Sequence, residues 1–170
     1  RCTGSCRATA EAMFGAKTLE KYKPETLSEL LSQGKLAAFL KERGAEADLG
    51  GWAKTMLPLA GKPIVTYHKN LAYFAHRFDL EVVEALEPKP GVIPSASHLE
   101  RVIALMKSRG VRAAFRTVVQ PEKPVAKVCE ETGATAVVFP HQVDADAETT
   151  SYVRMIDRIV AGASGALTGP

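Results

Sequence analysis

The chain has 170 residues, of which 46% are hydrophobic, and a formal net charge of +3. This length can bury one core of ordinary size, so we expect one domain or one lobe of a larger protein. The small, scattered positive charge does not favour nucleic acid as a partner. No apolar run approaches the roughly 20 residues that a membrane-spanning helix needs, so the chain is not expected to span a membrane.

Residues 1–59 show a helical but interrupted pattern. Gly34 interrupts this pattern and Gly44 ends it. Apolar side chains recur at helical spacing, at Leu27, Leu30, Leu31, Leu36, Phe39 and Leu40. We therefore predict a helical N-terminal or connecting segment over residues 1–59.

The three cysteines carry little information about function. Cys2 and Cys6 form a C-x3-C pair near the start of the chain, which is compatible with a disulfide, a metal clip or no special role. Cys129 lies within a predicted helix, where a small thiol that packs against a sheet is expected.

From residue 60 onward, short apolar runs alternate with helical segments. The apolar runs are expected to be buried strands at residues 63–67, 80–86, 111–119 and 134–139. Helices are expected between and after them, at residues 69–78, 97–110, 122–133 and 149–163. This order predicts an α/β lobe over residues 60–163, an open four-stranded parallel sheet with helices on both faces. A Gly/Ala/Ser-rich tail after Ala161 is expected to fray, with residues 164–170 disordered.

The helix predicted over residues 97–110 has clear signals at both ends. Ser97 and Glu100 have the spacing of a capping box, which predicts that Ser97 is the N-cap. Gly110 is expected to end the helix.

Several polar residues follow the predicted strands. In a parallel sheet the carboxyl ends of the strands form one edge, and ligands bind outside that edge. His76 and His98 lie within or at the start of helices and are expected to be surface or cap residues. The residues that can converge at the edge are His68, Gln120, Glu122, His141, Asp144, Asp146 and Glu148.

Imidazole and carboxylate groups together suit a first-row divalent cation. No H-E-x-x-H or C-x2-C motif is present, so any metal site has to be assembled from separate loops. His68 can equally be a structural hydrogen-bonding group, and residues 140–148 can be a solvated acidic turn. No G-x-S-x-G elbow, G-x-G-x-x-G or phosphate-binding loop is present, which argues against a hydrolase or nucleotide site.

The order of the motifs resembles a known family. Tyr67, His68, Tyr73 and Phe74 form a Y-H-x4-Y-F motif, and an E-x-K-P-G turn follows at residues 87–91. The sequences "SASHL" and "EETGA" and a Tyr152/Asp157 pair come later. With these motifs, residues 50–163 resemble the C-terminal lobe of the zinc and manganese solute-binding proteins of bacterial ABC transporters, the periplasmic zinc-uptake component family.

The resemblance implies a two-lobed protein with one metal ion between the lobes. In that family the C-terminal lobe offers a His or Glu after its first strand and, in many members, an Asp after its last. His68 falls on the first position, and His141 lies nearest the second, with Asp144 and Asp146 as less favoured substitutes. Tyr67, Tyr73 and Phe74 are expected to pack the lobe.

The same resemblance implies zinc, or alternatively manganese, as the bound ion. It also implies an ABC transporter membrane permease as the partner and the periplasm or bacterial cell envelope as the location. The family's N-terminal lobe supplies two histidines, whereas no histidine precedes His68 here. We therefore expect a fragment that lacks the N-terminal lobe and binds metal weakly by itself. Two alternatives remain, an α/β enzyme that uses His68 with a carboxylate as acid and base, and an interaction lobe without metal.

Overall fold

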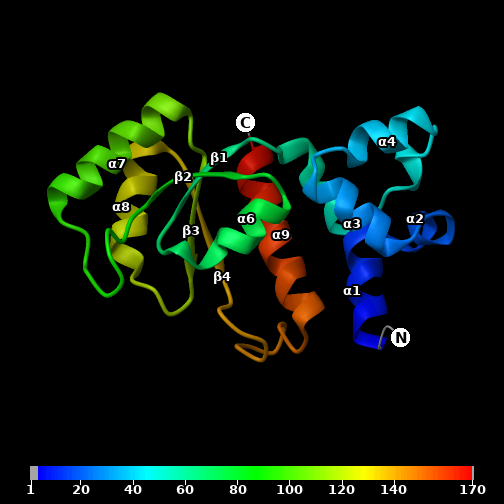
Figure 1. Ribbon diagram of the computed structural model, residues 1–170. Helices are drawn as coiled ribbons and strands as arrows, with labels where there is room; N and C mark the ends of the chain where they lie inside the picture. Colours follow the sequence, from blue (N-terminus) through cyan, green and yellow to red (C-terminus); the bar gives the residue numbers. More distant parts are fainter. Residues whose placement is uncertain (1–3, 170) are drawn as a thin grey trace.

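The N-terminal part of the protein is a group of short helices (Figure 1). The computed structural model describes residues 4–169. The helices are α1 (Gly4–Phe14), α2 (Ala16–Lys21), α3 (Pro24–Ser32), α4 (Leu36–Glu42) and α5 (Gly51–Met56), with 3-10 turns η1 (Glu46–Asp48) and η2 (Leu57–Leu59). Phe14, Leu27, Leu36 and Leu40 pack in a core of their own. The helical, interrupted pattern expected for this segment is confirmed.

The α/β part contains one parallel sheet. Its strands are β1 (Pro63–Thr66), β2 (Glu81–Ala85), β3 (Ala113–Thr117) and β4 (Thr135–Phe139), in the order β2-β1-β3-β4. All three neighbouring pairs are parallel. The predicted four-stranded parallel sheet is confirmed, with each strand one to four residues shorter than the apolar run that predicted it.

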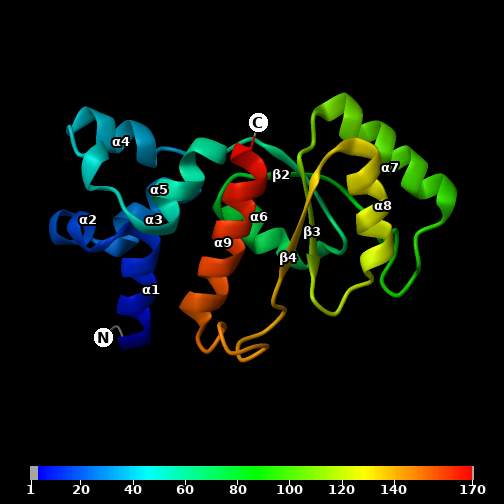
Figure 2. The same ribbon diagram turned by 180° about the vertical axis from the view of Figure 1, so that it is seen from behind.

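Helices cover both faces of the sheet (Figures 1 and 2). They are α6 (Ala72–Arg77), which follows the 3-10 turn η3 (Lys69–Leu71), α7 (Ala96–Arg109), α8 (Glu122–Thr132) and α9 (Tyr152–Thr168). Neighbouring residues of a strand point to opposite faces. Val65 therefore packs in the cluster of α7 and α8, whereas Ile64 packs in the cluster of α6 and α9. The central strands β1 and β3 are buried on both faces and read as near-continuous apolar runs, whereas the edge strands β2 and β4 keep exposed residues.

Helix α7 begins earlier than predicted. The hydroxyl of Ser95 accepts a 3.2 Å hydrogen bond from the backbone N–H of His98, so Ser95 is the N-cap. The predicted capping box of Ser97 and Glu100 is wrong, because Ser97 is already inside the helix and its spacing to Glu100 is coincidental. Gly110 ends the helix in a left-handed conformation, as predicted.

The expectation of a frayed tail is also wrong. Helix α9 continues to Thr168, with Leu167 buried, and Lys62 Nζ donates a 3.0 Å hydrogen bond to the Leu167 carbonyl oxygen. The small residues are part of this packing, since a Cβ at Gly162 would lie 2.8 Å from Val137 Cγ1 of β4. Small side chains thus let α9 lie close against the sheet. No helix within residues 4–169, α9 included, is long and apolar enough to cross a membrane.

The boundary predicted near residue 60 crosses a continuous core. Trp52 and Met56 of α5 pack in the cluster of α6 and α9, although α5 precedes that boundary. Ala53 of the same helix packs with the N-terminal helices. Helix α5 therefore joins the two parts, and the division into domains stays a prediction.

Candidate metal-binding site

His68 lies at the carboxyl edge of the sheet, two residues after β1 ends at Thr66. Strand β1 is paired with β2 on one side and with β3 on the other. The connection after β1 therefore leads to one side of the sheet, and the connection after β3 leads to the other. Such a switch point is where α/β sheets place their ligands. A cavity of about 440 Å³ opens here, lined by Tyr67, His68, Glu87, Pro90, Gly91, Ile93, Val119, Gln120 and Pro121.

The imidazole of His68 is held by a carboxylate. Its Nδ1 contacts Glu87 Oε2, and the other carboxylate oxygen accepts a 2.7 Å hydrogen bond from the backbone N–H of Gly91. The backbone N–H of Glu87 also donates to the Tyr67 carbonyl oxygen at 2.9 Å, which ties the end of β2 to the end of β1. The Glu87 side chain is 12% exposed and that of His68 is 36% exposed. The carboxylate is thus largely buried, while the imidazole reaches the cavity.

This arrangement leaves the other imidazole nitrogen for a ligand. When Nδ1–H donates to Glu87, Nε2 carries a lone pair, and within residues 4–169 it makes no hydrogen bond. Histidines that bind metal ions commonly donate their second nitrogen to a carboxylate in this way. His68 therefore fits a first-row divalent cation. Sequence reasoning missed the role of Glu87, whose signal was the E-x-K-P-G turn that it opens.

The aromatic residues of the Y-H-x4-Y-F motif divide between core and surface. Tyr67 is buried, and burial, together with the charge of Glu87, raises the pKa of its phenol. Phe74 is buried and meets Phe78 edge-on at 5.0 Å between ring centroids. Tyr73 is 93% exposed. The expectation that Tyr73 packs the lobe is wrong, because α6 turns Phe74 and Phe78 inward and Tyr73 outward.

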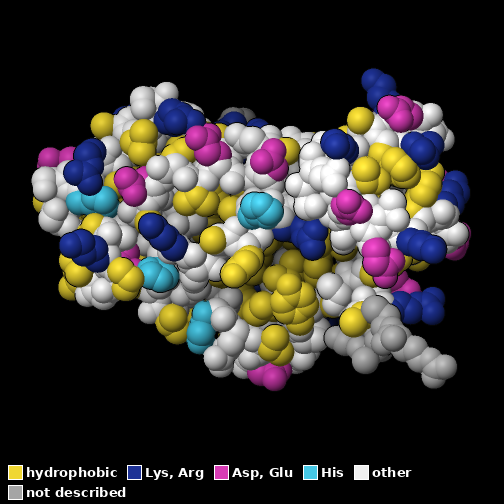
Figure 3. Space-filling model, in the orientation of Figure 1, with side chains coloured by type: hydrophobic (Ala, Val, Ile, Leu, Met, Phe, Trp, Pro, Cys, Tyr) yellow, Lys and Arg dark blue, Asp and Glu magenta, His cyan; other side chains and the backbone are white. Residues whose placement is uncertain are grey.

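His141 is exposed and lines a different cavity. It follows β4, which lies two positions from β1 in the sheet, about 10 Å away at the usual strand spacing. The cavity of His141 has about 880 Å³ and includes Trp52, Phe74 and Ile156. Hydrophobic side chains gather over α9 on this face of the molecule (Figure 3). His68 and His141 therefore share the carboxyl edge but not a cavity.

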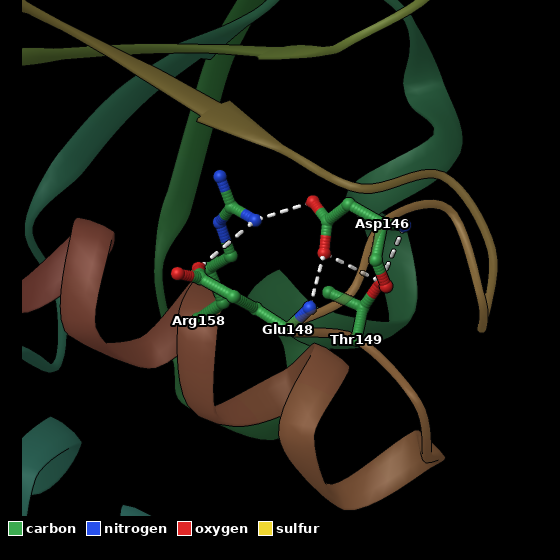
Figure 4. A network of polar contacts seen from close by, with 4 residues as sticks. All are labelled: Asp146, Glu148, Thr149 and Arg158. Atoms are coloured by element: carbon green, nitrogen blue, oxygen red, sulfur yellow. Dashed lines mark hydrogen bonds and ion pairs between the residues drawn. The ribbon is translucent and has the colours of Figure 1, made fainter.

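The acidic loop before α9 is held together by its own contacts (Figure 4). Asp146 accepts hydrogen bonds from the Thr149 hydroxyl and the Glu148 backbone N–H, both at 3.0 Å, and its second oxygen pairs with Arg158. Burial acts to raise the pKa of Asp146, but Thr149, the Glu148 N–H and Arg158 outweigh it, so that this pKa is lowered. Asp144 is exposed, in a left-handed conformation. A metal ion at Asp146 would have to compete with Arg158.

The seven polar residues expected at one edge do not converge. Gln120 alone joins His68 in the smaller cavity, and Glu122 pairs with Arg116 at 3.4 Å. Nowhere in residues 4–169 do three or more His, Cys, Asp or Glu side chains form a group that could hold a metal ion. The expected convergence is wrong, since the strands that carry these residues are spread across the sheet. The ligand roles of His68, His141, Asp144 and Asp146 stay predictions.

The remaining histidines lie outside the His68 cavity. His76 is exposed on α6, as expected, and lines the larger cavity that contains His141. His98 is only 7% exposed, with Nε2 3.1 Å from the Ala85 carbonyl oxygen and Nδ1 2.7 Å from Arg101 Nη2. His98 lies in the first turn of α7, but the expectation of a surface position is wrong. Its buried imidazole connects that turn to the end of β2.

The cysteines give no metal site in the described part of the chain. Cys2 lies outside the described residues, so the C-x3-C pair stays untested. Cys129 packs, partly buried, beside the cluster of α7 and α8, and burial raises the pKa of its thiol. This agrees with the packing role expected for it.

Residues 18–162 match the family model described as "Zinc-uptake complex component A periplasmic". A curated relative from Brucella abortus, the "High-affinity zinc uptake system protein ZnuA", is 27% identical over 131 residues, which are 74% of this chain and 36% of that protein. The chain therefore spans about a third of the length of this relative. The family description names a component of an uptake complex and no catalytic activity.

Solved structures share the fold. FpvC from Pseudomonas aeruginosa, in complex with Mn²⁺, aligns with a TM-score of 0.57 and 22% identity over 95% of this chain and 57% of its own. A crystal structure of ZnuA aligns with a TM-score of 0.56 and 22% identity over 89% of this chain and 60% of its own. With the family match over residues 18–162, these findings show that the chain belongs to the family of periplasmic zinc-uptake complex component A.

Proposed function

We propose that this chain binds a divalent metal ion, zinc or alternatively manganese, as part of the metal-binding component of an ABC uptake transporter. In this role the ion is the cargo, which the protein captures in the periplasm or cell envelope and passes to a membrane permease. Family membership supports zinc uptake, and the fold is shared with a protein solved with Mn²⁺. In such a cycle the chain forms and releases only coordination bonds to the ion, so it needs no catalytic acid, base or nucleophile.

The position of His68 carries the proposal. Its imidazole stands in the cavity at the switch point of the sheet, with Nδ1 held by Glu87. A neutral imidazole nitrogen is a preferred ligand for zinc, whose sites in proteins are almost always four-coordinate. His68 supplies one of those ligands. We infer that the others come from outside residues 4–169, from rearranged loops or from water.

The rim of the His68 cavity is apolar and exposed. Ile93 is 80% exposed and Val119 is 67% exposed, and both line the cavity beside Pro90 and Pro121. Exposed apolar side chains that gather in one place are typical of contact sites. We infer that a protein surface covers this rim, excludes water from the ion and supplies further ligands.

Of the other predicted ligands, His141 ranks first. It is exposed at the same edge of the sheet as His68, at the end of a strand two positions from β1. Asp144 is also exposed, but Asp146 would have to release Arg158 first. The alternatives of an enzyme or a metal-free interaction lobe gain no specific observation from the structure.

Calorimetric titration with zinc and with manganese tests the proposal. The samples are the chelator-stripped chain, His68→Ala, and His76→Ala as a control that removes an exposed histidine outside the His68 cavity. We expect measurable zinc binding that His68→Ala abolishes and His76→Ala leaves intact. Zinc binding of equal strength in the wild type and His68→Ala would contradict the proposal.

A further inference from the structure

We propose that Glu87 is a positioning residue that sets the tautomer and orientation of His68. This inference rests on the proposed function in that His68 is taken as the metal ligand. Glu87 acts through the imidazole, because its carboxylate contacts Nδ1 and leaves Nε2 toward the cavity. The orientation that metal binding needs would then exist before any ion arrives.

The carboxylate is itself held in place. One oxygen contacts His68, and the other accepts the Gly91 N–H at 2.7 Å. With the side chain 12% exposed, few other partners compete for these oxygens. Glu87 therefore has little freedom to turn away from the imidazole.

The turn from Glu87 to Gly91 builds this contact into the backbone. Pro88 and Pro90 restrict the backbone through their rings. Gly91 has φ 79°, a left-handed conformation that glycine adopts without strain, and it directs its N–H to the Glu87 carboxylate. A further hydrogen bond, from Val92 N–H to the Lys89 carbonyl oxygen at 2.9 Å, closes the turn. The turn formed by the E-P-K-P-G sequence thus holds the Glu87 carboxylate in one position.

The chemical consequence follows from the two nitrogens of imidazole. A neutral histidine carries its proton on either nitrogen, and the partner of one nitrogen decides which. A carboxylate at Nδ1 keeps the proton there and leaves the lone pair on Nε2. Loss of a carboxylate of this kind typically weakens metal binding by about 10–100-fold.

The first test reads the tautomer without any metal. Nitrogen-15 NMR of the histidine rings is recorded at about pH 8.5, two units above the ordinary imidazole pKa. We expect His68 of the wild type to carry its proton on Nδ1 and Glu87→Gln to show a mixture, because a glutamine amide can either accept from or donate to Nδ1. Glu81→Gln is the matched control, since that carboxylate lies at the start of β2, the strand that leads to Glu87, but pairs with Arg109. An unchanged tautomer in Glu87→Gln would overturn the inference.

The second test separates positioning from folding. We expect Glu87→Gln to bind zinc about 10–100-fold more weakly, with its thermal midpoint close to that of the wild type. Gly91→Ala should also weaken zinc binding, because it disturbs the turn that holds Glu87. An alanine is strained at the positive φ of Gly91, although no atom lies within 4 Å of the Cβ. Unchanged zinc affinity in Glu87→Gln, or zinc on Nδ1 of His68 in the NMR spectrum, would overturn the inference.

The two tests distinguish this inference from the proposed function. A wild-type chain that binds no zinc contradicts the proposed function alone, and the tautomer measurement then decides the role of Glu87. A wild-type chain that binds zinc through His68 with no dependence on Glu87 supports the proposed function and overturns the inference.

Discussion

The indole N–H of Trp52 donates a 2.6 Å hydrogen bond to Asp157 Oδ1, across 105 positions of sequence. Trp52 belongs to α5 and Asp157 to α9, so the contact joins the N-terminal helices to the last helix of the α/β part. The indole ring is buried, at 4% exposure, in the cluster that also contains Ile159 of α9. This pair anchors the helical segment beside the sheet.

Trp52→Phe should lower the free energy of unfolding by about 1–3 kcal/mol, because the aromatic packing is largely kept while the charged acceptor loses its donor. Denaturant unfolding measures the change. Asp157→Asn retains an acceptor oxygen and should cost less. An equal loss in both variants would contradict the expectation that a neutral acceptor oxygen keeps most of this hydrogen bond.

Gly51→Ala should be one of the more damaging single substitutions in the N-terminal segment. Gly51 has φ 59°, and a Cβ there would lie 2.1 Å from the Ala12 carbonyl oxygen. Backbone strain and overlap together predict a loss of about 2–5 kcal/mol in unfolding free energy. Gly61→Ala is the control, since its φ is also positive but no atom lies within 4 Å of the Cβ, and strain alone costs about 1–2 kcal/mol. Equal losses would show that α1 and α5 can separate without cost.

Asp48 should make stability depend on acid pH. Lys17, and then Lys21, hold its pKa below the ordinary value of 3.8, against the opposing effect of burial. Because the folded pKa is the lower one, the contribution to stability is complete above about 3.8 and is lost as the pH falls through the folded value. For Lys21 the sign is opposite, since its pKa is raised above 10.5, chiefly by the hydrogen bond to Asp48, and its contribution is lost only at alkaline pH.

Thermal unfolding between about pH 2.5 and 6 checks the Asp48 prediction. Asp48→Asn should lower the melting temperature near neutrality and flatten its fall toward acid. Asp79→Asn is the control, because no ion pair of Asp79 is found within residues 4–169. A wild-type acid slope that persists unchanged in Asp48→Asn would refute the assignment.

Leu167→Ala tests whether the C-terminal end of α9 belongs to the fold. The side chain is 1% exposed, so its truncation should cost about 2–5 kcal/mol in denaturant unfolding. Thr168→Ala, at the exposed next position, should stay within about 0.5 kcal/mol of the wild type. A Leu167→Ala variant with the same unfolding free energy as the wild type would mean that the tail frays, as its composition suggested.

The sheet and its helices could be predicted from sequence because their signals are local. Each strand is a short apolar run, and Gly110 and Gly133 end their helices in left-handed conformations. The tail could not be predicted, because a run of Gly, Ala and Ser has weak local preference. It is stabilised by contact with β4, where Gly162 lies close to Val137. This contact cannot be predicted from composition alone.

The candidate site was predictable in part. A histidine directly after a strand points to the carboxyl edge, and His68 is there. The separation of His68 from His141 depends on the strand order, which places β3 between β1 and β4. The role of Glu87 depends on how the turn after β2 folds back on β1, a long-range relation that no spacing rule gives.

A zinc titration followed by amide chemical shifts tests the central claim, that this chain offers metal an imidazole at the switch point of the sheet. We expect the first residues to shift to be those of one cavity, His68, Glu87, Gly91 and Gln120. We also expect His68→Ala to remove these shifts. Shifts confined to residues 141–149, or to the N-terminal cysteines, with no response at His68, would contradict it.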